Sequence, residues 1–191
     1  MATPKDLPIL PFASALLLGQ WLCEHHTHPD GVWIKVARKA SGVASVTHDE
    51  AVDMALCYGW IDGQRKSHDD RFFLQKFTPR RPRSLWSKRN INKIAELTVA
   101  GRMQPSGLAE VEAAKQDGRW EAAYDSSKDM VVPEDFLVAL GENTQAQSFF
   151  NTLSKSNVYA IAWRLATAKT PETRKRRFDA LLAMLGTGEF Q

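Results

Sequence analysis

The first part of the chain alternates between helical and strand-like patterns of apolar residues. Within 16–26, Leu17 and Trp21 lie four positions apart, as do Leu18 and Leu22, which predicts a helix. The segment VWIKVAR at 32–38 is rich in β-branched residues and predicts a strand. These patterns predict one helix and one strand, joined by the turn-forming sequence HPDG.

A second helix and a second strand follow. Thr47 and Glu50 have the spacing of a capping box, so a helix is expected to begin there, and Gly59 suits its C-terminal end. Asp62-Gly63 indicates a turn. The segment RFFLQKF at 71–77 has apolar residues at both odd and even positions, which predicts a strand covered on both faces.

Beyond residue 80 the apolar spacing and the capping residues are those of helices. We therefore predict an α+β protein, with an N-terminal mixed α/β part that holds a small sheet, followed by a C-terminal all-helical bundle. The predicted domains are residues 1–130, which would carry a basic-aromatic groove, and residues 131–191. The polar segment DSSKD at 125–129 is expected to link them.

Composition narrows the class of protein. Of 191 residues, 43% are hydrophobic and 25% charged, which is typical of a globular protein and excludes a disordered chain. The two cysteines, Cys23 and Cys57, are too few for a disulfide framework. With no long apolar run and no basic n-region before the short apolar stretch at 13–18, we expect a cytoplasmic protein that does not insert into membranes.

Positive charge is concentrated in one part of the sequence. The net charge is only +3, but residues 61–102 hold 11 basic and 4 acidic groups, a difference of +7. Within this stretch, residues 76–93 hold seven basic groups and no acid. Such a run is either a solvated basic face or a surface that binds an anion.

Five unusual sequence motifs lie along the chain. They are ALCYGWIDG at 55–63, FTPRRPRSLWSKRN at 77–90, GRMQPSG at 101–107, AKQDGRW at 114–120 and AKTPETRKRR at 168–177. Through them the chain, from about Trp21 to Leu185, resembles the bacterial YdeI/OmpD-associated family, also called bacteriocin-protection proteins. The resemblance implies a link to envelope proteins and to resistance against cationic antimicrobial peptides. It implies no biochemical activity.

The basic stretch predicts an anion-binding groove. Prolines fix the backbone between the arginines, a tryptophan offers an apolar platform, and a helix that starts at Ser87 would present backbone N–H groups. The predicted ligand-binding residues are Trp60, Asp62, Arg80, Arg81, Trp86, Ser87, Lys88 and Asn90. The alternatives are a buried tryptophan turn at Trp60 and a solvated or internally paired basic face.

Metal binding and nucleophilic catalysis have weaker support. Cys23, Glu24, His25, His26 and His28 are metal-ligand types, but their spacing is poor for a structural site and no second cluster accompanies them. We therefore predict no metal and no cofactor.

No nucleophile in the sequence has an evident base. His48 and Cys57 lie nine residues apart on one predicted helix, too far for a catalytic pair. His48 and His68 are expected to be surface groups without a clear partner. We assign no catalytic residue.

These observations favour a non-catalytic binding or adaptor protein that contributes to envelope-stress or bacteriocin tolerance. Its expected partners are a protein of the envelope-stress response and a small anion. One alternative is an enzyme acting on a small phosphorylated or carboxylated molecule, with Asp62 or Asp69 as base. A nucleic-acid-binding module is a further alternative, although no known nucleic-acid-binding motif is present.

Overall fold

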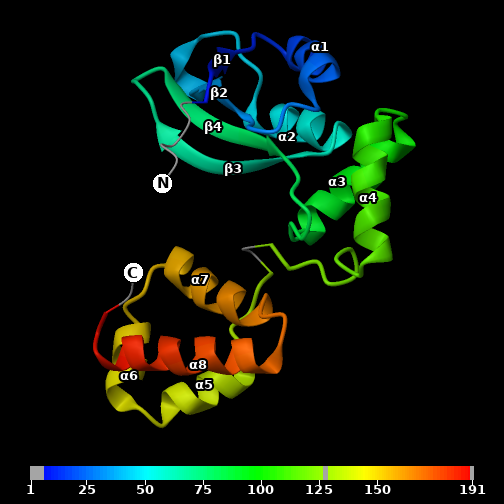
Figure 1. Cartoon of the computed structure of the whole chain (residues 1–191). Helices are drawn as coiled ribbons and strands as arrows, with labels where there is room; N and C mark the ends of the chain where they lie inside the picture. Colours follow the sequence, from blue (N-terminus) through cyan, green and yellow to red (C-terminus); the bar gives the residue numbers. More distant parts are fainter. Residues whose placement is uncertain (1–6, 127–128, 190–191) are drawn as a thin grey trace, which may run out of the picture. The chain divides into compact units, whose positions relative to one another are not determined.

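The computed structural model describes residues 7–126 and 129–189. They form two compact units. One comprises the described residues up to Trp86 together with Asn90–Ala122, and the other comprises Ser87–Arg89 together with the described residues from Ala123 onward. The first holds a four-stranded sheet and helices, and the second is helical, so the predicted α+β class is confirmed (Figure 1).

The sheet has the strand order β1-β2-β4-β3. Its strands are β1 (Ile9–Pro11), β2 (Val32–Ala37), β3 (Trp60–Ser67) and β4 (Phe72–Pro79). β1 pairs parallel with β2, whereas β2 with β4 and β4 with β3 pair antiparallel. The predicted strands at 32–38 and 71–77 are confirmed, and β4 lies in the sheet interior between β2 and β3.

Two helices cover one face of the sheet. They are α1 (Ala15–His25) and α2 (His48–Cys57), which lie on the same side of it in Figure 1. Leu18 and Leu22 of α1 and Ala55 of α2 pack against Ile34 and Phe77 of the sheet. All five are almost fully buried, so this is the core of the first unit.

The start of α2 confirms the predicted capping box. The Thr47 hydroxyl accepts a hydrogen bond from the Glu50 backbone N–H, and the Glu50 carboxylate accepts one from the Thr47 N–H. The hydrogen bonds that the Glu50 carboxylate accepts from the Thr47 N–H and the Thr47 hydroxyl lower the pKa of Glu50. Gly59 follows the helix with φ +80°, a conformation that favours glycine.

The predicted turn at Asp62-Gly63 is wrong. β3 continues through both residues to Ser67, and the pairing register with β4 shifts between Asp62 and Arg65. A glycine in a strand often marks such a bulge, and here it lies on an edge strand whose later residues are exposed. The sequence pattern also missed β1, which has only three residues.

Helices α3 (Lys88–Val99) and α4 (Pro105–Gln116) follow the sheet. α4 packs closely on the end of α2, because a Cβ atom added at Gly107 would lie 2.2 Å from the Cys57 carbonyl oxygen. The Gln104 backbone N–H donates to that oxygen at 3.0 Å. Gly107 thus permits the close contact between these helices.

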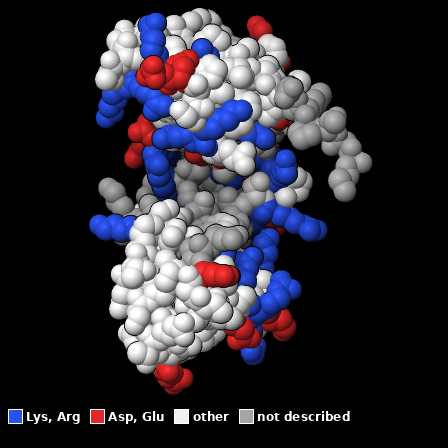
Figure 2. Space-filling view, turned by 90° about the vertical axis from the view of Figure 1, so that its left-hand side faces the viewer, with Lys and Arg blue, Asp and Glu red and all other residues white. Residues whose placement is uncertain are grey.

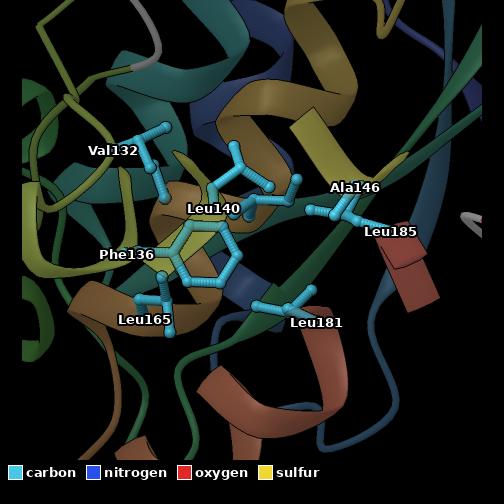
Figure 3. Packing of buried hydrophobic residues seen from close by; sticks show 9 residues of the cluster. Val132, Phe136, Leu140, Ala146, Leu165, Leu181 and Leu185 are labelled. Atoms are coloured by element: carbon cyan, nitrogen blue, oxygen red, sulfur yellow. The ribbon is translucent and has the colours of Figure 1, made fainter. Parts of the chain in front are cut away.

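The second unit contains α5 (Glu134–Gly141), α6 (Thr144–Phe150), α7 (Lys155–Ala166) and α8 (Pro171–Gly186). Their apolar faces meet in one core, which is shown in Figure 3. Phe136 is fully buried at its centre and packs edge-on against Phe178 at 5.0 Å. Of the expected linker 125–129, residues 127 and 128 lie outside the described residues. No helix within 7–126 or 129–189 has the length and apolarity to cross a membrane.

Candidate functional site

Arg80 and Trp86, two residues of the predicted groove, form a buried stack. The Arg80 guanidinium carbon lies 3.4 Å from the centre of the Trp86 ring, and its Nη1 donates to the Leu85 carbonyl at 3.2 Å. Arg80 is 5% exposed and Trp86 1%. This arginine therefore stabilises its own loop by a cation–π contact.

The segment after α4 packs on the same stack. Trp120 lies 5.0 Å from Trp86, and Arg119 donates to the Ser84 carbonyl while its Nε is 2.7 Å from the Asp117 carboxylate. The motifs at 77–90 and 114–120 thus contact each other in the folded chain. Their unusual residue pattern is explained in part by this packing.

Trp60 and Asp62 lie in the sheet. Trp60 is fully buried between the sheet and α1, where its Nε1 donates to the His26 carbonyl at 2.8 Å. Asp62 is partly exposed, and its Oδ2 lies 3.6 Å from Nε2 of His48. The expectation that His48 has no clear partner is therefore wrong, because β3 extends where a turn was predicted.

The other predicted residues have different surroundings. Arg81 is exposed and Asn90 is 8% exposed. Ser87 forms a bridge with Tyr124, and the Lys88 ammonium lies 2.7 Å from the Asp125 carboxylate, both within the second unit. The structure thus brings Arg80 and Trp86 into direct contact, and it pairs Trp60 with Pro79, the residue before Arg80, whose backbone N–H donates to the Gly59 carbonyl at 3.0 Å. A ligand-binding role for these eight residues stays a prediction.

A different group of basic residues lines an open pocket in the first unit. The pocket has a volume of about 520 Å³ and is lined by Arg38, Arg65, Lys66, Ser67 and Phe73. We call it the basic pocket. Three of its lining residues are cations, and the other two supply a hydroxyl and an aromatic wall. Figure 2 views the molecule from the side of the β3–β4 turn, where many Lys and Arg side chains lie on this unit.

Neutral groups hold the arginines of the basic pocket in place. Arg38 donates to the Ser67 hydroxyl at 3.1 Å and to the Asp69 carbonyl at 3.3 Å. Arg65 donates to the Gln75 side-chain oxygen at 3.1 Å and stacks 4.4 Å from the Phe73 ring. Because these partners carry no formal charge, they orient the guanidinium groups without neutralising them.

Two family models match separate stretches of the chain. Residues 10–110 match a family described as a domain of unknown function (DUF8412). The chain belongs to this family. Residues 129–188 match the family described as Bacteriocin-protection, YdeI or OmpD-Associated, which confirms the resemblance predicted from the motifs. A search of curated proteins and a search of solved structures each gave no match.

The YdeI/OmpD-associated match is shorter than the predicted stretch from Trp21 to Leu185. It contains the motif at 168–177, whereas the motifs at 55–63, 77–90 and 101–107 lie in the DUF8412 stretch. The motif at 114–120 lies outside both matches. The basic pocket belongs entirely to the DUF8412 stretch.

The sequence pattern did not reveal this pocket. With a turn predicted at Asp62-Gly63 and no strand predicted between it and residue 71, nothing in the pattern places Arg65 and Ser67 on one face of a strand. One sequence signal could have indicated the strand that carries them. The polar segment QRKS at 64–67 comes shortly before the apolar strand at 71–77, and a polar strand beside an apolar one is typical of the edge of a sheet. Arg38 joins them because β2 ends next to the start of β4.

The titratable groups give little support to catalysis. Burial raises the pKa of the Cys57 thiol, which keeps it protonated and a poor nucleophile. Desolvation alone would raise the pKa of Asp69, but hydrogen bonds from the Arg71 and Phe72 N–H groups outweigh it and lower that pKa. A carboxylate of low pKa is a weak base. Among residues 7–126 and 129–189, no three His, Cys, Asp or Glu residues are grouped as metal ligands.

Proposed function

We propose that this chain is a non-catalytic anion-binding protein that contributes to envelope-stress or bacteriocin tolerance. The observation that carries the anion-binding part is the basic pocket, where Arg38 and Arg65 are held by neutral partners. A guanidinium pair beside a hydroxyl suits phosphate or carboxylate groups. The tolerance role rests on the bacteriocin-protection match over residues 129–188.

A cytoplasmic adaptor role with a protein partner is part of the same proposal. Direct capture of a cationic peptide in the basic pocket is disfavoured, because like charges repel. We infer that the pocket instead binds an anionic ligand or an acidic segment of the partner.

A thermal-shift experiment tests the anion-binding proposal. The panel contains inorganic phosphate, pyrophosphate, citrate and a sugar phosphate, each added to the full chain. A ligand that binds only the folded state raises the melting temperature. We expect a rise with at least one anion, and we expect it to be lost in an Arg38→Ala/Arg65→Ala variant.

The matched control is Arg81→Ala/Arg176→Ala, which removes the same charge from two exposed positions outside the pocket. This variant should keep the full shift. No shift with any anion, or an equal loss of shift in both variants, would refute a specific anion site in the basic pocket.

A further inference from the structure

The sheet face opposite α1 and α2 combines aromatic rings with lysines. Residues alternate between the two faces along a strand, and Ile34 and Phe77 point toward the helices. The neighbouring residues Trp33 and Lys35 of β2 therefore belong to the opposite face. Register pairs Trp33 with Lys76, so this face carries a cation beside an aromatic ring.

The same register extends the pattern across β3 and β4. Phe72 pairs with Ala37, and Lys66 pairs with Leu74, which places both on the face of Trp33. The Lys66 ammonium lies 4.4 Å from the Trp33 ring, and the Lys35 ammonium lies 4.5 Å from the Phe72 ring. We call Trp33, Lys35, Lys66, Phe72 and Lys76 the aromatic–lysine face.

The charged residues of the aromatic–lysine face are all basic. The paired positions on it, across the described strands, hold Ile9, Pro11, Trp33, Lys35, Ala37, Ile61, Lys66, Phe72, Leu74, Lys76 and Thr78, with no Asp or Glu among them. Lys66 is exposed, and Trp33, Lys35, Phe72 and Lys76 are partly exposed. The Trp33 and Phe72 rings thus each have a lysine ammonium beside them, and the paired positions of this face carry no carboxylate, although Asp69 in the β3–β4 turn lies near enough to Lys35 for that lysine to help lower its pKa.

We propose that the aromatic–lysine face binds single-stranded nucleic acid. Aromatic side chains stack on unpaired bases of any sequence, and neighbouring lysines contact the phosphates. Here Lys66 and Lys35 lie over the rings themselves, so they can move from the ring to a phosphate when a base takes their place. A duplex keeps its bases stacked inside and cannot use these rings, which gives a preference for single strands.

This inference goes beyond the proposed function and uses a different surface. Arg65 and Ser67 of the basic pocket alternate with Lys66 along β3, so they belong to the opposite face. Lys66 is common to both surfaces, but its ammonium lies over Trp33. A variant at Arg38 and Arg65 therefore leaves the aromatic–lysine face unchanged.

Fluorescence anisotropy with a labelled oligothymidylate tests the inference on the full chain. A Lys35→Ala/Lys66→Ala variant should bind about tenfold more weakly at low salt, and the slope of log K against log salt should fall by about 1.4. Phe72→Leu keeps an apolar side chain but removes the stacking ring. It should weaken binding about fivefold or more with an unchanged salt slope.

The control for charge is Lys155→Ala/Lys169→Ala, which removes two exposed lysines of the helical unit. It should bind like the wild type, as should Arg38→Ala/Arg65→Ala. Thermal melts of every variant establish that each is folded under the binding conditions.

Three results would overturn the inference. They are an equal loss of binding in both lysine variants, equal affinity for a duplex of the same length, and binding of anionic lipid vesicles in place of the oligonucleotide. If small anions bind the basic pocket but no oligonucleotide binds, the inference fails and the proposed function stands. If the oligonucleotide binds but no small anion does, the inference stands and the anion-binding part of the proposed function fails.

Discussion

Arg80 and Arg81 are adjacent in the chain, but their environments differ completely. Arg80 is 5% exposed and stacks on Trp86, whereas Arg81 is exposed to solvent. A buried guanidinium acts through its packing and its hydrogen bond to the Leu85 carbonyl, while an exposed one acts through its charge. The two positions of the RR pair therefore differ in how they act, Arg80 through its packing and Arg81 through its charge at the surface.

This difference predicts unequal effects on stability. Arg80→Ala removes the cation–π contact and a hydrogen bond from a charged donor, so the free energy of unfolding should fall by about 2–3 kcal/mol. Arg81→Ala changes an exposed side chain and should stay within about 0.5 kcal/mol of the wild type. Urea unfolding of both variants measures this. Equal losses would show that Arg80 does not support the loop.

At the scale of helices and strands, the sequence predicts those elements that are specified by residues close together in the chain. Thr47 and Glu50 specify the start of α2 within four residues, and the β-branched run of β2 needs no distant partner to be recognised. β3 is not predicted because the turn signal at Asp62-Gly63 is local, whereas pairing with β4 is not. The pairing of β3 with β4 therefore decided that Asp62 and Gly63 belong to a strand and not to a turn.

The same limitation applies to the candidate site. The pairing of β3 with β4 places Arg65 opposite Gln75, and the pairing of β2 with β4 brings Arg38 close to Ser67. Arg38 and Ser67 are 29 positions apart in sequence, so no local pattern relates them. Arg80, in contrast, lies in the noticed basic run, but its burial depends on contacts with Trp86 and on the distant motif at 114–120.

One ion pair between helices gives a prediction about pH. Arg174 of α8 donates two hydrogen bonds to the Asp135 carboxylate of α5, at 2.7 and 2.9 Å. The hydrogen bond with Arg174 is the largest cause that lowers the pKa of Asp135 below its ordinary value of 3.8. A carboxyl whose pKa is depressed by folding stabilises the folded state above its unfolded pKa, and this contribution is lost as the pH falls through the folded pKa.

Asp135→Asn should therefore lower the melting temperature at neutral pH. The difference from the wild type should stay constant down to about pH 5 and should shrink toward zero as the pH falls below 3.8 and through the lowered pKa of Asp135. Thermal melts across this range measure it. Glu134→Gln is the control, because it removes a charge from the same helical turn without breaking the ion pair. If both variants show the same dependence on pH, the ion pair is not its cause.

At the scale of the whole molecule, each unit has a hydrophobic core of its own. Ile34, Leu74 and Phe77 are almost fully buried in the sheet unit, and Phe136 and Leu165 are buried in the helical unit. A unit with its own core can unfold as one cooperative transition. The separate matches over residues 10–110 and 129–188 agree with a chain assembled from two such parts.

We therefore expect the units to unfold independently, with two calorimetric transitions. Phe136→Ala removes a fully buried ring and should cost about 3–5 kcal/mol in the helical unit alone, while Ile34→Ala should cost about 2–5 kcal/mol in the sheet unit alone. Each variant should lower one melting temperature and leave the other unchanged. If either substitution instead shifts both transitions equally, the chain unfolds as one cooperative domain, because the loss of one core then removes the stability of the other.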